Sequence, residues 1–349
     1  MTDLVPVTVL TGYLGAGKTT LLNRILTENH GKKYAVIVNE FGEVGIDNDL
    51  VVDADEEVFE MNNGCVCCTV RGDLIRILTG LMRRKGGFDA IIVETTGLAD
   101  PGPVAQTFFV DEEVRARTRL DSVTTVVDAK HVLLRLSDSR EAREQIAFAD
   151  QIVLNKTDLV SADDLRMVEA RLRRLNPLAP IHRAQRSNVP LEAILGRGSF
   201  DLDRIVSLEP DFLNPAHGEP GHVHDEHCDH DHGHDHGHGH DHAHHDHVHD
   251  DDIKGVALTL QKPLDGAKIT RWLNDILQSQ GPDILRAKGI MDVAGDERRL
   301  VFQAVHMILE GDFQRPWKPD EARYSRLVFI GRNLDEAALR AGFEACAAA

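Results

Sequence analysis

The chain is poor in cysteine, in aromatic residues and in long apolar runs. It has five cysteines in 349 residues, and aromatic residues make up 5% of it. No apolar run approaches the roughly 18 residues that a membrane-spanning helix needs. The first residues, Met1 to Leu4, also lack a basic start before a long apolar stretch. We therefore expect a cytoplasmic protein with no membrane partner.

Acidic residues outnumber basic ones, with 57 Asp and Glu against 39 Lys and Arg, so the formal net charge is −18. The segment from His217 to Asp252 holds eleven acidic residues and no Lys or Arg, so it accounts for −11 of that charge. The remainder of the chain is only mildly acidic. This charge balance argues against nucleic acid as a partner, because nucleic-acid binding depends on Lys and Arg neutralising phosphates.

The positions of the cysteines argue against a secreted disulfide scaffold. Cys65, Cys67 and Cys68 stand too close together to pair readily with one another, and Cys228 and Cys346 are isolated. Reduced thiols in a cytoplasm fit this pattern better.

The N-terminal part of the chain alternates short apolar runs with stretches of helical spacing, which is typical of an α/β fold with a doubly wound parallel sheet. The predicted strands are 7–10, 34–39, 90–94, 122–128 and 151–155, and the predicted helices are 19–28, 74–84, 140–149 and 162–175. Ligands of such folds bind at the edge where the strands end.

The rest of the chain divides into a low-complexity tract and a second domain. Residues 217–252 hold fifteen of the nineteen histidines and cannot form a core. The segments after the tract predict a smaller α+β domain, in which two helices cover one face of a sheet. Its predicted strands are 253–260, 284–293, 300–309 and 324–330, and its predicted helices are 265–280 and 334–345. The predicted domain limits are 1–200, 201–252 for the linker with the tract, and 253–349.

A phosphate-binding loop follows the first predicted strand. Its sequence, GYLGAGKT, matches GxxxxGK[ST] and stands between a strand and an amphipathic helix. Glycines let backbone N–H groups face the phosphates, Lys18 reaches the β- and γ-phosphates, and Thr19 ligates Mg²⁺. The expected nucleotide contacts are Gly12, Gly15, Ala16, Gly17, Lys18, Thr19 and Thr20.

Two further segments are expected to face the γ-phosphate. The strand Ala90 to Glu94 ends in a carboxylate that would orient the Mg²⁺ shell or the attacking water, and the Gly97 N–H would sense the γ-phosphate. Asp47 occupies the place of a switch segment and would reach Mg²⁺ or water. The alternatives are a strand-end acid at a turn for Glu94 and a surface turn for Asp47.

The segment Asn155-Lys156-Thr157-Asp158 follows an apolar strand and matches NKxD, the guanine-reading signature of GTPases. The Asp158 carboxylate accepts hydrogen bonds from N1–H and the exocyclic amine of guanine, whereas adenine offers neither donor there. The Lys156 stem packs on the base, and Asn155 braces the loop. This motif favours GTP and GDP over adenine nucleotides, with a polar turn as the alternative.

The cluster Cys65, Cys67 and Cys68 offers three thiolates, which suit zinc or Cu(I), with Co²⁺ as a further option. Three protein ligands leave one position open, as in a site that releases its ion. Glu40 or Glu43 could complete the shell, or both could be solvated loop acids. Redox chemistry and ordinary buried cysteines are the other readings of the cluster.

The histidine tract alternates His with Asp or Gly. Neutral imidazoles bind zinc, cobalt and nickel, so the tract predicts several weak and exchangeable metal sites. A purely solvating linker is the alternative.

Taken in order, GYLGAGKTTLLNRIL, NEFGE, NGCVCC, IIVETTGLADP and NKTD resemble the CobW-type P-loop GTPases, which include YjiA-like proteins and zinc-regulated GTPase metalloprotein activators. The resemblance implies GTP hydrolysis coupled to delivery of a metal, commonly zinc, to a client metalloprotein. Many members carry Glu immediately before the Asn of NEFGE. This chain has Val38 there, which shifts the expected auxiliary ligand to Glu43.

These observations predict a GTP-hydrolysing metallochaperone that binds zinc at the CxCC motif and transfers it to a client. One alternative is a metal-storage protein that uses the His tract, with the GTPase domain regulatory. Another is a small-molecule kinase, against which NKTD speaks. The client stays open, as does a homodimer.

Overall fold

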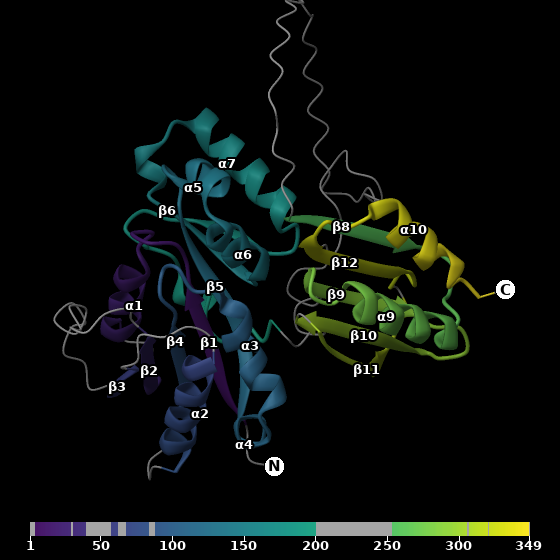
Figure 1. Ribbon diagram of the computed structural model, residues 1–349, viewed down its shortest axis with the longest axis horizontal. Coiled ribbons are helices and arrows are strands. Elements are labelled where there is room, and N and C mark those ends of the chain that lie inside the picture. The colour runs from purple at the N-terminus through teal and green to yellow at the C-terminus, as the bar shows by residue number, and fades with distance from the viewer. Residues whose placement is uncertain are drawn as a thin grey trace, which may run out of the picture.

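The computed structural model describes residues 4–28, 31–39, 57–61, 68–83, 88–199, 253–305, 307–319 and 321–348. These residues form two sheets, each with its own helices (Figure 1). None of the helices within these ranges is both long and apolar enough to cross a bilayer.

The first sheet has seven parallel strands in the order β3-β2-β4-β1-β5-β6-β7. Its strands are β1 (Val5–Thr11), β2 (Tyr34–Asn39), β3 (Glu57–Met61), β4 (Ala90–Glu94), β5 (Thr118–Asp128), β6 (Gln151–Asn155) and β7 (Ile181–Arg183). Later strands are added on both sides of β1, so the order reverses between β1 and β5. Ligands of open α/β sheets bind at such a reversal.

Helices cover both faces of this sheet, which confirms the predicted doubly wound architecture. They are α1 (Lys18–Thr27), α2 (Cys68–Met82), α3 (Pro101–Val110), α4 (Glu112–Arg115), α5 (Val132–Asp138), α6 (Arg140–Phe148) and α7 (Ala162–Leu175). Leu21, Leu22 and Ile25 of α1 pack on one face with Val36 and Val153. The buried residues of α2, α3, α6 and α7 pack on the other face.

The second sheet is antiparallel, in the order β11-β10-β9-β12-β8. Its elements are β8 (Ile253–Leu260), α9 (Gly266–Gln280), β9 (Ile284–Asp292), β10 (Arg298–Val305), β11 (Ile308–Pro316), β12 (Ser325–Arg332) and α10 (Glu336–Ala345). Both helices pack on one face of it, through Ile269 and Leu273 of α9 and Leu339 and Phe343 of α10. The predicted α+β domain is therefore confirmed.

The prediction of one strand over 300–309 is wrong. The chain reverses between Val305 and Ile308, which pair with each other, so β10 and β11 form a hairpin. The two residues between them are His306 and Met307. Neither is the Gly, Asn or Asp that marks most tight hairpin turns, so the apolar residues on both sides read as one run.

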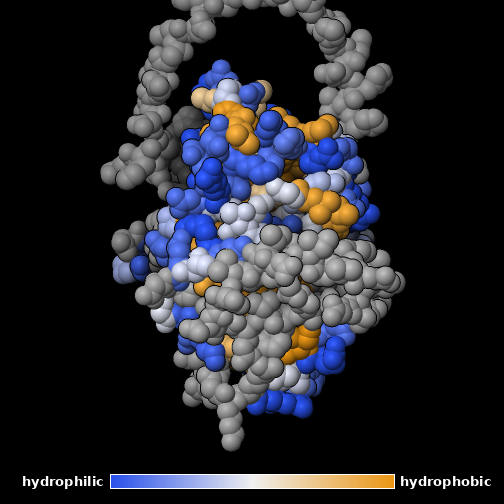
Figure 2. Space-filling model, turned by 90° about the vertical axis from the view of Figure 1, so that its left-hand side faces the viewer, coloured by the Kyte–Doolittle hydropathy of each residue, from blue (hydrophilic) through white to orange (hydrophobic). Residues whose placement is uncertain are grey.

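Seen from the left of Figure 1, the described residues are mostly hydrophilic, with apolar side chains in small separate patches (Figure 2). Exposed large apolar residues of the first domain include Leu14, Leu98, Leu133 and Leu134.

Candidate nucleotide-binding site

The predicted phosphate loop connects β1 to α1 in a conformation that requires glycine. Gly12, Gly15 and Gly17 have φ angles of 141°, 73° and 112°, which L side chains rarely adopt. A Cβ atom at Gly12 would also lie 2.2 Å from the Val126 carbonyl oxygen of β5. The loop is therefore pressed against the neighbouring strand. The Lys18 Nζ donates to the Gly12 carbonyl at 2.9 Å, so the lysine reaches back across the loop.

The loop leads directly into the start of α1. Gly17 is the N-cap residue and contributes no side-chain hydrogen bond to the helix. The N–H groups of Lys18, Thr19 and Thr20 belong to the first turn, where they have no acceptor within the helix. Together with the helix dipole they make an anion-binding site, so the predicted phosphate contacts share one position at the end of β1.

Asn155 braces this loop, as predicted from the NKxD motif. Its side chain is buried, and its Nδ2 donates to the Ala16 carbonyl at 2.9 Å and to the Ser187 Oγ at 3.1 Å. Its Oδ1 accepts from the Ser187 N–H at 2.8 Å, and the Ser187 hydroxyl donates to the Gly17 carbonyl at 3.0 Å. One asparagine therefore joins the phosphate loop, β6 and the loop after β7.

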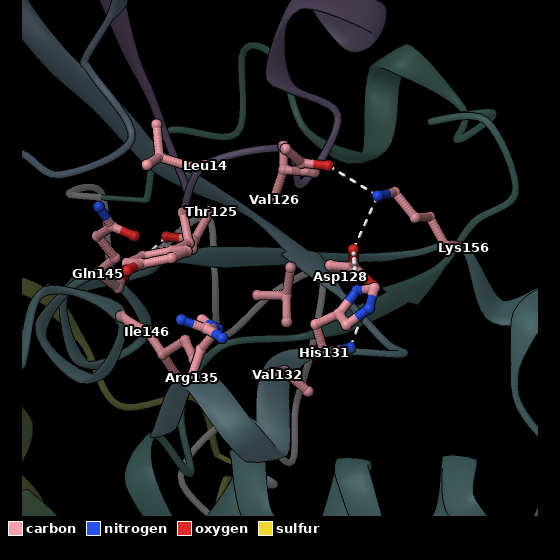
Figure 3. A pocket seen from close by; sticks show the side chains of 14 residues that line it. Leu14, Thr125, Val126, Asp128, His131, Val132, Arg135, Gln145, Ile146 and Lys156 are labelled. Carbon is pink, nitrogen blue, oxygen red and sulfur yellow. Dashed lines mark hydrogen bonds and ion pairs between the residues drawn. The ribbon is translucent and has the colours of Figure 1, made fainter. Parts of the chain in front are cut away.

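Lys156 links the phosphate loop to the end of β5. It adopts a left-handed conformation with φ 62°, and its Nζ donates to the Gly15 carbonyl at 2.8 Å and to Asp128 at 2.7 Å. Figure 3 shows Lys156 and His131 approaching the Asp128 carboxylate. Partial burial alone would raise the pKa of Asp128, but hydrogen bonds from Lys156 and His131 outweigh it and hold that pKa below its usual value.

Asp158 lies on a short turn, Thr157–Leu159, and is exposed. The Thr157 hydroxyl donates to the Ala184 carbonyl at 3.0 Å, which fixes this turn against the loop after β7. The carboxylate is therefore accessible to a base held between these two loops.

Glu94 ends β4 and Gly97 follows it, and both adjoin the phosphate loop from the other side of β1. Glu94 is buried and pairs in register with Leu10, and the Thr95 hydroxyl donates to the Thr11 hydroxyl at 2.8 Å. A Cβ atom at Gly97 would lie between 2.6 and 2.9 Å from atoms of Leu14, so Gly97 packs directly on the loop tip. A shift of either segment must therefore move the other.

The chemistry of the donor set fits Mg²⁺. The Thr19 hydroxyl and the Glu94 carboxylate are hard oxygen ligands of the kind that Mg²⁺ takes, and both come from segments at the end of β1 or beside it. When bound, Mg²⁺ would neutralise the charge of the phosphates.

A cavity of about 340 Å³ lies beside the phosphate loop. Leu14 of the loop tip, Asp128 at the end of β5, Arg135 of α5 and Gln145 of α6 line part of it (Figure 3). The predicted phosphate contacts Gly17, Lys18 and Thr19 do not line it. The cavity therefore adjoins the nucleotide site on the side of α5 and α6.

Sequence reasoning missed three residues of this site, namely Asp128, Gln145 and Ser187. Asp128 had a signal, because it ends a predicted strand as Glu94 does. Ser187 and Gln145 had none, since each acts through contacts made across more than 30 residues.

Of the predicted metal site, Glu43, Cys65 and Cys67 lie outside the described residues. Asp47, predicted near Mg²⁺, lies outside them too. Cys68 is the first residue of α2, which begins six residues before the predicted helix over 74–84. Among the residues that the structure describes, no three His, Cys, Asp or Glu side chains are grouped to hold a metal ion.

Comparison with known proteins agrees with this geometry. Residues 6–183 match the family described as CobW/HypB/UreG, nucleotide-binding domain, and residues 253–347 match the cobalamin synthesis protein cobW C-terminal domain. The zinc chaperone YjiA of Escherichia coli strain K12 is 36% identical over 97% of this chain and 98% of its own length.

A shorter match covers little more than half of the chain. The zinc-regulated GTPase metalloprotein activator 1 of Schizosaccharomyces pombe is 42% identical over 59% of this chain and 50% of its own length. Among solved structures, the Zn(II)-bound YjiA GTPase from E. coli superposes with a TM-score of 0.74 at 31% identity, over 99% of this chain and 100% of the other.

Proposed function

The chain belongs to the CobW/HypB/UreG family and is a GTPase, and from that premise we propose that it is a zinc metallochaperone. In this proposal GTP binds at the phosphate loop and the NKTD segment, and Mg²⁺ is held by Thr19 with Glu94 near its shell. Zinc is the cargo, bound by Cys65, Cys67 and Cys68, and Co²⁺ is a second candidate. The loaded ion passes to a client metalloprotein in a step that depends on GTP.

The observation that carries the proposal is the sheet register around β3. All strands of the first sheet run parallel, so their carboxyl ends meet at one edge. Met61, the last residue of β3, pairs with Asn39, and Val38 pairs with Glu94. Met61 therefore ends β3 at the edge that carries the phosphate loop, and the cysteines follow it in the sequence.

The spacing of the strands gives the distance between the end of β3 and the phosphate loop after β1. β3 lies three strands from β1, which is about 14 Å at the usual spacing of about 4.8 Å. β2 is the neighbour of β3 and ends at Asn39, which Glu40 and Glu43 follow in the sequence. A switch segment can span this distance, so the state of the γ-phosphate can alter the geometry of thiolate ligands there. By linkage, zinc must then alter nucleotide affinity by the same factor.

The zinc chaperone and GTPase names of the relatives support the cargo and the coupling. Thiolate ligands need a reducing compartment, which fits a cytoplasmic protein.

The test is a comparison of Cys67→Ala with Cys346→Ala. Cys346 is buried in the second domain, where its thiol donates to the Gly342 carbonyl, so it serves as a matched control. Phosphate release from GTP is followed by stopped flow with and without zinc. We expect zinc to change the turnover of the wild type and of Cys346→Ala but not of Cys67→Ala, with GDP affinity retained in all three. A zinc response of wild-type size in Cys67→Ala would refute the proposed site.

The fifteen histidines of the tract favour metal storage as a second function. If the tract stores zinc, deletion of residues 217–252 should abolish storage, measured as zinc bound per chain. If the protein is a chaperone, the same deletion should only slow the loading of its client.

A further inference from the structure

Helix α6 lies between the two sheets. It contacts β5 in the first domain and β8 and β9 in the second (Figure 1). Phe148 and Ile146 of α6 belong to the same apolar cluster as Leu285, Val328 and Ile330 of the second sheet. One hydrophobic core therefore spans both domains, and α6 is part of it.

One side of α6 holds the segment that follows β4. The Gln145 side chain is 1% exposed, and its Nε2 donates to the carbonyl oxygens of Gly97 and Ala99, each at 3.1 Å. The Thr125 hydroxyl donates to the Gln145 carbonyl at 2.8 Å, which ties the helix to β5. The carbonyl of Gly97, whose N–H is expected to sense the γ-phosphate, is thus held by a side chain of α6.

The neighbouring residue on α6 is tied to the second domain. Glu144 is buried and accepts a hydrogen bond from Arg332 of β12, and it also accepts from Arg140 at 2.7 Å. The residue before Gln145 therefore connects the helix to the second sheet, while Gln145 itself connects it to Gly97.

The end of α6 carries a second connection. Asp150 accepts from Arg286 at 2.6 Å and from Lys288 at 2.7 Å, both on β9, and these three side chains are at most 3% exposed. Arg286 also donates to the Phe148 carbonyl at 3.3 Å. Breaking a buried ion pair by removing one partner leaves an uncompensated charge, so α6 and β9 are expected to move together.

We propose that Gln145 is a positioning residue that couples Gly97 to the second domain, so that the second sheet responds to the presence of the γ-phosphate. This inference rests on the proposed GTPase cycle. A displacement of Gly97 toward the γ-phosphate changes its bond to Gln145, and α6 passes the change to Arg332, Arg286 and Lys288.

The cavity beside the loop makes such a displacement feasible. Close-packed interiors resist movement, but Leu14 and Gln145 both border the cavity of about 340 Å³ (Figure 3). Leu14 packs on Gly97, so the loop tip, Gly97 and Gln145 form a continuous contact with free volume on one side.

The test uses hydrogen exchange in the full chain, loaded with GDP or with a non-hydrolysable GTP analogue. In the wild type, amides of β9 and β12 should differ between the two states by about fivefold or more, the lower end of common coupling energies. In Gln145→Met the difference should fall below about twofold, because the methionine keeps the volume but cannot donate.

Gln151→Met is the matched control. Gln151 is also a buried glutamine, and its Oε1 is hydrogen-bonded to the His182 ring at 2.8 Å. It lies at the start of β6, away from Gly97. This variant should keep the wild-type difference. If it loses the difference as Gln145→Met does, or if Gln145→Met keeps it, the assignment of Gln145 is wrong.

Arg332→Met provides a second route should Gln145→Met fail to fold. It removes the bond to Glu144 and leaves Gly97 untouched, so the exchange difference should again shrink. If the wild type hydrolyses GTP but its β9 and β12 amides exchange equally in both nucleotide states, only the proposed coupling is wrong. A wild type that neither binds nor hydrolyses GTP overturns the proposed function instead.

Discussion

Replacing Asn155 by alanine should weaken nucleotide binding through the loop that the asparagine braces. The change removes three side-chain hydrogen bonds and leaves the Ala16 carbonyl and the Ser187 N–H without their partner. Each of these two unsatisfied buried groups costs about 1–3 kcal/mol, so the free energy of unfolding should fall by about 2–6 kcal/mol. If about 1.4 kcal/mol of that cost appears as a displaced phosphate loop, the Kd for GDP rises by about tenfold.

Calorimetric GDP binding and urea unfolding measure the two effects separately. Asn176→Ala is the control, because Asn176 is equally buried and donates at 2.8 Å to the Ile146 and Ala149 carbonyls, away from the phosphate loop. It should lose comparable stability. Its GDP affinity should stay within about threefold of the wild type, because effects at distant sites are nearly independent. An Asn155→Ala protein that is destabilised but binds GDP as the wild type does would refute this reasoning.

Three further predictions concern charged residues. Glu94→Gln should lower GTP turnover by about a hundredfold or more, measured as phosphate release, while GDP binding is retained. Asp158→Asn should weaken GTP binding by about a hundredfold and favour xanthosine triphosphate in competition assays, because an amide cannot accept both guanine donors. Asp150→Asn should cost about 3–5 kcal/mol in urea unfolding at pH 7, because Arg286 and Lys288 then lose their buried counter-charge. Burial alone would raise the pKa of Asp150, but these ion pairs lower it. Its stabilising contribution is therefore present above about pH 4, its unfolded pKa, and is lost on further acidification. The wild type should lose more stability than Asp150→Asn as the pH falls below 4.

The sequence predicted the helices and strands whose bounds depend on their own residues. The strand over 90–94 and the helix over 162–175 match β4 and α7 at both ends. β4 is a short continuous apolar run, and α7 has the period of an amphipathic helix. The hairpin between Val305 and Ile308 was missed because its turn lacks the residues that favour one. The early start of α2 at Cys68 was missed because no capping residue marks it.

The nucleotide site was predictable where one segment supplies the chemistry. The phosphate loop and the NKTD turn carry their function in consecutive residues. Gln145 and Ser187 could not be predicted from the sequence, because each contacts a loop brought close only by the sheet order. The same is true of Asp150, whose partners Arg286 and Lys288 lie more than 130 residues away.

The most direct test of the account is the zinc dissociation constant measured with a bound GTP analogue and again with GDP. Coupling between the thiolates and the γ-phosphate predicts constants that differ by about fivefold or more, and a Cys67→Ala variant in which that difference is lost. The same constant in both nucleotide states would contradict GTP-dependent delivery of zinc.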